Sequence, residues 1–301
     1  MKAVQFREYG GPEVLQLVDL PDPHPGPGQI RVAVRAVGVN PVDYKMRAGT
    51  MPGELPQTTG REVAGVVDEI GAGVTDAASG DTVFGFAAGG GGAAELALLE
   101  NYAPIPLSLD FARAAALPVA VETATRALDL LHAGDGTTVL INGAAGGVGS
   151  AAVQIARNRG ARVIGTASPG NHEYLRSLGA EPTTYGEGLV TRVRAIAPDG
   201  VDAALDAHGG GALPALVELA GTPDRVVTIA DYQGAQATGA RFSGGMGTSR
   251  AMYALADVGR EIEAGRFALE VFKTYPLEQI ADAHRDSEAG HLRGKLVLLV
   301  G

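Results

Sequence analysis

Short β-rich runs alternate with glycine- and proline-rich breaks over the first third of the chain. Their spacing, and the turn residues between them, predict strands of an antiparallel, partly barrel-like domain. One helix interrupts the strands, since Asn40 is a good N-cap, Pro41 suits the first helical position and Gly49 can end the helix. The predicted strands are 2–7, 14–19, 29–37, 62–70, 82–86 and 94–99.

From about residue 108 the pattern changes to apolar, strand-like runs that alternate with helical ones. Nearly continuous apolar strands between helices predict a parallel sheet covered on both faces. The fold class is therefore α/β, with a mostly antiparallel domain followed by a doubly wound parallel sheet. The predicted helices are a short one opened by 108–110, then 119–132, 147–159, 172–178, 189–197 and 213–220, and the strands are 138–141, 162–166, 201–205 and 226–230.

The last part of the chain adds elements that can belong to either domain. We predict a helix over 252–264, a strand over 269–273, a helix over 277–288 and a strand over 295–300. Residues 232–250 are rich in Gly, Ala, Ser and Thr, which is typical of a mobile loop, and we take this stretch as a candidate lid.

Composition and charge narrow the classes of function. The 301 residues contain no cysteine, which excludes disulfides, a thiolate nucleophile and cysteine-ligated metal sites. The net charge of -10 argues against a nucleic-acid or anionic-membrane partner. The charged N-terminus lacks the apolar stretch of a signal peptide, and the longest apolar run, 114–121, is short of the ~20 residues of a membrane helix. We therefore expect a soluble, cytoplasmic protein.

The strongest chemical signal is a strand, a glycine turn and a helix over 138–159. In the GxGxxG spacing, the central glycine lets a pyrophosphate approach the backbone and the last lets the helix pack on the strand. The helix N-terminus offers free N–H groups to the anion. We predict a dinucleotide here; the alternative is a tight glycine corner without a ligand. Ala144, Gly146 and Gly149 have this spacing, and the turn residues expected to bind the cofactor are Ala144, Ala145, Gly146, Gly147 and Val148.

The end of the next predicted strand indicates which dinucleotide binds. NAD sites carry an acidic residue about 20 positions beyond the turn, where it binds the ribose 2′-hydroxyl. Here Ser168 and Asn171 follow the strand, and no Asp or Glu comes before Glu173. The missing carboxylate favours NADP(H), although Ser168 also suits a helix cap. His172 is interpreted as a surface helix residue rather than a phosphate ligand.

Further motifs carry a resemblance that covers essentially the whole chain. They are 38–45, 60–67, 80–85, 92–95, 115–118, Thr123, the glycine turn and 291–298. Their order resembles that of the zinc-free medium-chain dehydrogenase/reductases of the quinone oxidoreductase (ζ-crystallin-like) family. This resemblance implies a GroES-like catalytic domain over 1–117 and 259–301 and a Rossmann NADP(H)-binding domain over 118–258. It also implies a homodimer, paired through an edge strand near 226–230.

The zinc branch of this superfamily binds its catalytic metal with Cys, His and Glu. Arg61 stands where that branch has the histidine of Gly-His-Glu, and the six histidines form no pair at helical i, i+3 or i, i+4 spacing. We therefore expect no metal site. Without a Lewis acid, nothing strong polarises an unactivated alcohol or ketone. The hydride acceptor is expected to be electrophilic by itself, such as a quinone or an alkene conjugated to a carbonyl.

The helix that follows Asn40 supplies the candidate catalytic residues. Asn40 and Tyr44 lie one turn apart and can hydrogen-bond a carbonyl oxygen that gains charge, while Lys45 can supply charge or a proton. Asp43 is the fourth candidate. The alternative is that Asn40 caps the helix, Asp43 suits its first turn, Tyr44 packs on the core and Lys45 is solvated.

The resemblance also places cofactor contacts outside the glycine turn. It implies that Thr123 lies next to the nicotinamide and that Tyr185 flanks the adenosine 2′-phosphate, while Asn171 falls near a lysine that many relatives use for this phosphate. Thr123 is otherwise a mid-helix threonine bonded back to a carbonyl. The resulting prediction is an NADPH-dependent, metal-free reductase of quinones or enones. The alternatives are an enoyl-thioester reductase of a biosynthetic pathway and a non-catalytic NADP(H)-binding crystallin or sensor.

Overall fold

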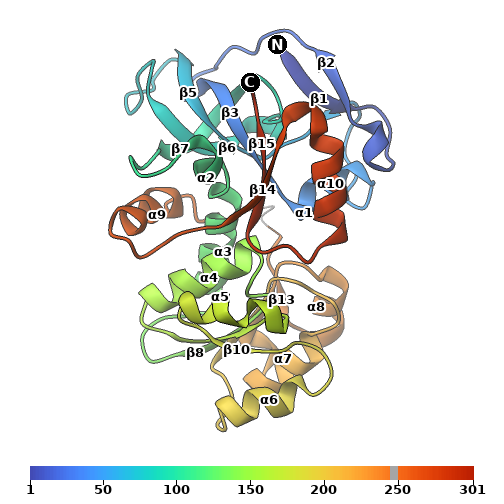
Figure 1. The fold of residues 1–301 in the computed structure, drawn as a ribbon, viewed down its shortest axis with the longest axis vertical. Helices are drawn as coiled ribbons and strands as arrows, with labels where there is room; N and C mark the ends of the chain where they lie inside the picture. Colours follow the sequence, from blue (N-terminus) through green and yellow to red (C-terminus); the bar gives the residue numbers. More distant parts are fainter. Residues whose placement is uncertain (245–249) are drawn as a thin grey trace. The chain divides into compact units, whose positions relative to one another are not determined.

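A computed structural model describes residues 1–244 and 250–301 (Figure 1). The chain forms two compact units. The first unit comprises Met1–Val119, Leu255–Gly265 and Leu269–Gly301, and the second comprises Ala120–Ala254 and Arg266–Ala268. The last strands and helix of the chain thus lie in the first unit. None of the helices in 1–244 and 250–301 combines the length and apolar character needed to cross a membrane.

The first unit is built on a six-stranded sheet. All neighbouring strands are antiparallel except the first two, and the third strand also pairs with the last, so that the sheet curls into a partly closed barrel. The order is β14 (Val271–Pro276), β15 (Lys295–Leu299), β3 (Ile30–Val39), β5 (Glu62–Ile70), β6 (Thr82–Ala87) and β7 (Leu96–Pro104). A smaller antiparallel sheet has the order β2 (Gln16–Asp19), β1 (Lys2–Phe6) and β4 (Gln57–Thr58).

Strand β3 runs through the core of this unit. Its first half alternates, because successive strand side chains point to opposite faces, and Ile30, Val32 and Val34 are at most 2% exposed. From residue 36 to Val39 every position is buried, after a register shift against β5. The helices of the unit are α1 (Pro41–Arg47), α2 (Phe111–Ala115), α9 (Ala254–Glu263) and α10 (Ile280–Ala289). Helix α1 starts directly after β3 and packs beside α10 (Figure 1).

The second unit is a sheet in which all neighbouring strands are parallel. The order is β10 (Glu181–Thr183), β9 (Arg162–Thr166), β8 (Thr138–Asn142), β11 (Ala203–Asp206), β12 (Val226–Thr228) and β13 (Arg241–Phe242). If these six strands are numbered 1 to 6 in chain order, starting at β8, their order in the sheet is 3-2-1-4-5-6. This is the order of the doubly wound dinucleotide-binding fold. Its helices are α3 (Pro118–Leu130), α4 (Gly147–Asn158), α5 (His172–Ser177), α6 (Leu189–Ile196), α7 (Leu213–Ala220) and α8 (Tyr232–Thr238).

The central strands of this sheet are covered on both faces. β8 and β11 are almost entirely buried, as the continuous apolar runs in the sequence predicted. Helices α6 and α7 pack on one face, where Leu189 and Leu216 join Leu140 and Ile164 in one apolar cluster. The predicted α/β class, with one antiparallel and one doubly wound parallel unit, is confirmed.

The prediction of a loop over 232–250 is wrong for its described residues. The Asp231 carboxylate accepts a hydrogen bond from the Gly234 N–H at 2.7 Å and begins α8, and Gly239, with a φ of 80°, ends it. Strand β13 follows. Small residues give a loop and a short helix similar compositions, so the capping residues were the better signal. The part of the lid hypothesis that falls on 245–249 lies outside the described residues.

The predicted edge strand is also wrong. β13 pairs with β12 on its outer side, so the strand near 226–230 is an inner strand and β13 is the edge of the sheet. The short strands β4, β10 and β13 were not predicted from the sequence. Each has at most three residues, too few for an alternating pattern to be recognised.

Candidate active site

The glycine turn between β8 and α4 has the shape that a pyrophosphate needs. Gly143 has a φ of 77°, a conformation that favours glycine. A Cβ on Gly149 would overlap the Gly143 carbonyl oxygen, so this glycine lets α4 pack on the turn. Among the residues that the structure describes, a Cβ on Gly146 would have only that oxygen within 4 Å, at 3.6 Å. The Gly146 face is therefore open beside the first N–H groups of α4, which lack an intrahelical acceptor.

Neutral polar side chains occupy the end of β9. Asn171 donates from Nδ2 to Ser168 Oγ at 3.3 Å, so the two predicted 2′-phosphate ligands lie side by side. Glu173, the first carboxylate after the strand, forms an ion pair of 3.1 Å within α5. His172 also lies on α5, with a ring nitrogen 3.3 Å from a backbone carbonyl oxygen. No carboxylate stands where an NAD site has one.

Tyr185 lies in the loop after β10, and 47% of it is exposed. Arg192 of α6 fixes this loop by donating to the Thr184 carbonyl oxygen at 2.9 Å. The ring of Tyr185 is 6.5 Å from that of His208, in the loop after β11. A Cβ on Gly143 would stand 2.7 Å from His208 Cβ, so His208 borders the glycine turn. Sequence reasoning missed His208, because no motif marks it and only the strand order brings it to Tyr185.

Thr123 is carried on α3, half-buried, with its hydroxyl 3.5 Å from Glu122 Oε2. Glu122 pairs with Arg126 at 2.8 Å, and both side chains are buried. Arg126 donates to the Ser243 carbonyl oxygen at 3.0 Å, and Glu122 accepts from the Ala251 N–H at 3.1 Å. The predicted nicotinamide neighbour, Thr123, therefore lies on a helix anchored by a buried ion pair, which the sequence did not predict.

In the first unit, both ends of the Asn40 side-chain amide are engaged. Nδ2 donates to Glu62 Oε1 at 2.7 Å, and Oδ1 accepts from the Lys295 ammonium. Glu62 also accepts from the Val119 N–H at 2.6 Å through its other oxygen. The sequence pattern did not point to Glu62 and Lys295. Their signal was a charged residue at the first position of a strand, directly before an apolar run.

Asp43 closes the N-terminus of α1. Its carboxylate accepts from the Asn40 N–H at 2.8 Å and is only 3% exposed. Burial raises the pKa of this carboxyl to about 6, against the opposing effects of the Asn40 N–H and the Arg61 and Lys295 charges. The structure thus brings Asn40 and Asp43 together as the cap of the helix.

Tyr44 and Lys45 remain half-buried on α1. Burial, and secondly the Glu288 carboxylate, raise the pKa of the Tyr44 phenol above its ordinary value. The phenol is therefore protonated at neutral pH and can donate a hydrogen bond. The Asp43 side chain closes the cap and the Asn40 side chain bonds to Glu62 and Lys295. Of the four candidates, Tyr44 and Lys45 are those whose side chains take part in neither arrangement.

Arg61 has a local partner. Its Nη2 donates to Met46 Sδ at 2.9 Å, which turns the guanidinium toward α1. Within 1–244 and 250–301, no three His, Cys, Asp or Glu side chains come close enough together to hold a metal ion.

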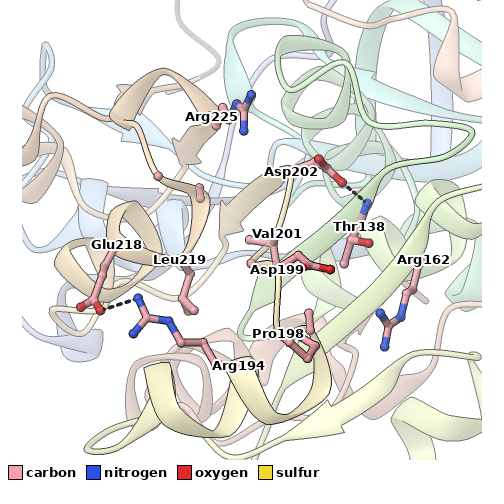
Figure 2. Close-up of a pocket in the computed structure, with 14 residues that line it drawn as sticks. Thr138, Arg162, Arg194, Pro198, Asp199, Val201, Asp202, Glu218, Leu219 and Arg225 are labelled. Atoms are coloured by element: carbon pink, nitrogen blue, oxygen red, sulfur yellow. Dashed lines mark hydrogen bonds and ion pairs between the residues drawn. The ribbon is translucent and has the colours of Figure 1, made fainter.

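A polar depression of about 520 Å³ lies at the opposite edge of the parallel sheet from the glycine turn. Its lining includes Thr138 and Arg162, the first residues of β8 and β9. Figure 2 shows Asp202 accepting from the Thr138 N–H, at 2.8 Å, and Arg194 paired with Glu218, at 2.9 Å. None of the predicted site residues lines this depression.

Comparison with known proteins places both units in one family. Residues 26–107 match the alcohol dehydrogenase GroES-like domain, and residues 178–298 match a family described as zinc-binding dehydrogenase. The chain is 35% identical to the quinone oxidoreductase of Rattus norvegicus over 324 residues, which cover 100% of this chain and 98% of the relative.

Two further matches bear on substrate and cofactor. The spectinabilin polyketide synthase system protein NorB of Streptomyces orinoci is 36% identical over 307 residues, which cover 96% of this chain and 14% of that protein. A mycobacterial protein solved in complex with NADPH is 29% identical, with a TM-score of 0.86 and 99% of both chains covered. The predicted GroES-like and Rossmann architecture is confirmed, and the chain belongs to the quinone oxidoreductase family of the medium-chain dehydrogenase/reductases.

Proposed function

We propose that this protein is an NADPH-dependent, metal-free oxidoreductase that reduces a quinone or the alkene of an α,β-unsaturated carbonyl. The observation that carries the proposal is the open Gly146 face at the N-terminus of α4, together with a β9 end that holds Ser168 and Asn171 in place of a carboxylate. The first feature suits a pyrophosphate and the second a 2′-phosphate. Similarity to a quinone oxidoreductase and to an NADPH complex supports the same assignment.

The cofactor would be held by the carboxyl edge of the parallel sheet. The residues 144–148 would surround the pyrophosphate, Ser168, Asn171 and Tyr185 would bind the adenosine 2′-phosphate, and Thr123 would lie at the nicotinamide. When bound, NADPH supplies a hydride from its nicotinamide ring.

The proposed acceptor follows from the polar groups of the first unit. The chain has no cysteine, and Arg61 stands in the Gly-Arg-Glu motif with its guanidinium turned to Met46. These residues support a reaction without zinc, in which the acceptor must be electrophilic by itself. Tyr44 and Lys45 would stabilise the oxygen that becomes negative, while Asn40 and Asp43 would keep α1 in place.

Atoms and electrons balance without a further reactant. An enone takes the hydride at its β-carbon, and a proton from water or a side chain then reaches the α-carbon of the enolate. A quinone takes one hydride and one proton to become a hydroquinone. In both cases NADPH is oxidised to NADP+.

The test is NADPH absorbance against a panel of quinones, enones and simple ketones, repeated with NADH. We expect oxidation of NADPH with quinones or enones, slower oxidation of NADH, and no turnover of simple ketones. If the protein binds NADPH but none of the acceptors supports its oxidation, the proposal that the protein is an enzyme is refuted. If the protein reduces simple ketones efficiently and a chelator abolishes this activity, the proposal that the reaction needs no metal ion is refuted.

A second candidate is reduction of an enoyl thioester. The similarity to a polyketide synthase protein favours it, because polyketide chains are assembled as thioesters. The hydride chemistry is that of enone reduction, so the binding of the acceptor alone distinguishes the two. A crotonyl thioester that turns over with a much higher kcat/KM than any simple quinone would select this candidate.

A further inference from the structure

The carboxyl ends of four neighbouring strands in the second unit are joined by one chain of side-chain hydrogen bonds. Thr166 of β9 donates to Asn142 Oδ1 of β8 at 2.7 Å. Asn142 Nδ2 donates to Asp206 Oδ1 of β11 at 2.9 Å, and Thr228 of β12 donates to Asp206 Oδ2 at 2.8 Å. All four side chains are at most 2% exposed. We call these four residues the strand-end network.

Each member of this network, apart from Asn142, also holds the loop that leaves a strand. Thr166 Oγ accepts from the Gly143 N–H at 3.0 Å, at the start of the glycine turn. Asp206 Oδ1 accepts from the N–H groups of His208, at 3.2 Å, and Gly209, at 2.8 Å. Thr228 Oγ accepts from two N–H groups of the loop after β12, at 3.2 and 3.1 Å. Ligands of doubly wound sheets bind at this edge.

Asp206 sets the direction of every bond in the network. Its two oxygens accept four hydrogen bonds, so Asn142 turns its Nδ2 toward Asp206 and Thr228 points its hydroxyl there. The Asn142 oxygen is then left for Thr166, and the Thr166 oxygen is left to receive the Gly143 N–H. The orientation of the glycine turn is therefore linked, through Thr166 and Asn142, to a carboxylate on the neighbouring strand β11.

Hydrogen bonds, and not a counter-ion, stabilise this buried carboxylate. Asp206 is 0% exposed, and no Lys, Arg or His of the described residues forms an ion pair with it. Burial of an unpaired charge is costly unless hydrogen bonds offset the lost hydration. Its four donors do so, and two of them are backbone groups of the loop in which His208 lies against Gly143.

We propose that Asp206 is a positioning residue for NADP(H). By fixing the loops after β8, β11 and β12, it sets the glycine turn and the His208 loop before the cofactor arrives, so that less ordering remains for binding to provide. This inference rests on the proposed function, because it takes NADP(H) as the ligand of this edge. It concerns Asp206, Asn142 and Thr228, which do not need to touch the cofactor.

The test compares Asp206→Asn with a matched variant at Asp202, directly before the same strand. Asp202 also accepts a backbone N–H, at 2.8 Å, but at the opposite end of the sheet. The amide of Asp206→Asn presents a donor to Thr228 or to the loop, so at least one bond of the network reverses or breaks. We expect the Kd for NADPH, measured by calorimetry, to rise about tenfold or more in Asp206→Asn and to stay within about twofold in Asp202→Asn.

Stability is measured in parallel, because a damaged fold also weakens binding. Leu216→Ala opens a cavity under α7 in the same unit, and we expect it to lower the Tm with an unchanged Kd. If Asp206→Asn fails to fold, the pair Thr228→Val and Thr228→Ser replaces it. The serine keeps the hydroxyl and is expected to keep the affinity, while the valine loses both.

The outcomes separate the inference from the function on which it rests. Wild-type affinity in folded Asp206→Asn and Thr228→Val overturns the positioning role alone. A rise in Kd for Leu216→Ala equal to that of Asp206→Asn, at an equal loss of Tm, also overturns it. Failure of the unmodified protein to bind NADPH overturns the proposed function and this inference together.

Discussion

Lys295 Nζ lies 2.6 Å from Glu62 Oε1, and the two side chains are 5% and 0% exposed. The pair joins the last strand of the chain, β15, to β5, across 233 positions of sequence. Asn40 bonds to both partners. The N-terminus of α1, which carries Tyr44 and Lys45, is thus attached to a buried charge pair.

Removing one partner of this pair is expected to lower the free energy of unfolding much more than removing both charges. Lys295→Met leaves an uncompensated carboxylate and should lower the free energy of unfolding by about 3–5 kcal/mol. The double variant Lys295→Met/Glu62→Gln removes both charges and should be more stable than Lys295→Met alone. Urea unfolding of the wild type, Lys295→Met, Glu62→Gln and the double variant measures this coupling. As a control, Lys273→Met on the neighbouring β14 breaks an exposed ion pair of 3.0 Å and should cost less than about 1 kcal/mol. Simple additivity of the effects of Lys295→Met and Glu62→Gln would contradict the prediction.

Gly146→Val tests where the pyrophosphate binds. Gly146 has a φ of -74° and a ψ of 173°, which valine adopts readily, so its backbone is not strained. The new side chain would fill the open face of the turn and should raise the Kd for NADPH at least about tenfold. Gly134→Val, at another glycine of the unit with only one distant neighbour, at 3.7 Å, serves as the control. Unchanged NADPH affinity in folded Gly146→Val would refute the placement.

Two buried groups of the first unit should make opposite contributions to stability between pH 4 and 6. Burial, and secondly the Arg47 charge, lower the pKa of His284 from 6.5 to about 4. As pH falls from 6.5, the unfolded chain takes up a proton that the folded one does not, so stability is lost. Burial raises the pKa of Asp43 from 3.8 to about 6. As pH rises from 3.8, the unfolded chain releases a proton that the folded one keeps, so stability is again lost.

Single variants separate these contributions. In His284→Gln the Asp43 effect is no longer opposed by His284, and it should lower the free energy of unfolding by about 1.4 kcal/mol per unit as pH rises from 4 to 6. In Asp43→Asn only the His284 effect remains, and the slope should have the opposite sign. Chemical denaturation at several pH values measures both. Parallel slopes in the two variants would show that one of these groups is not shifted in the folded state.

Local signals in the sequence were enough to predict the elements that carry the candidate site. Asn40-Pro41 and the glycine turn encode backbone conformations that neighbouring residues determine, and α1 and α4 begin where these residues stand. The buried pair of Lys295 and Glu62 could not be predicted from the sequence, because the two residues meet only after β15 joins β3. His208 meets Tyr185 for the same reason, since the order of the strands and not their sequence makes them neighbours.

Ser168→Asp should change the preference between the two nicotinamide cofactors. A carboxylate at the end of β9 would repel the 2′-phosphate and could accept from a ribose 2′-hydroxyl. We expect the Kd for NADPH to rise about tenfold or more, with no loss of NADH affinity. Ser177→Asp, at an exposed serine of α5 whose hydroxyl bonds to a carbonyl at 2.7 Å, adds the same charge away from the site. Equal weakening of NADPH binding in both variants would point to net charge rather than to a 2′-phosphate contact.

Tyr44→Phe tests whether α1 acts on the acceptor. The raised pKa keeps the Tyr44 phenol protonated, so the wild-type side chain can donate to an oxygen that becomes negative, whereas phenylalanine cannot. Loss of one such donor should lower kcat about tenfold to a hundredfold and leave the Kd for NADPH unchanged. Tyr9→Phe removes a phenol of the same unit that bonds to the Gly53 carbonyl oxygen at 2.6 Å, and it should affect stability only. An unaltered kcat in Tyr44→Phe, with chemistry rate-limiting, would leave Lys45 as the remaining donor on this helix.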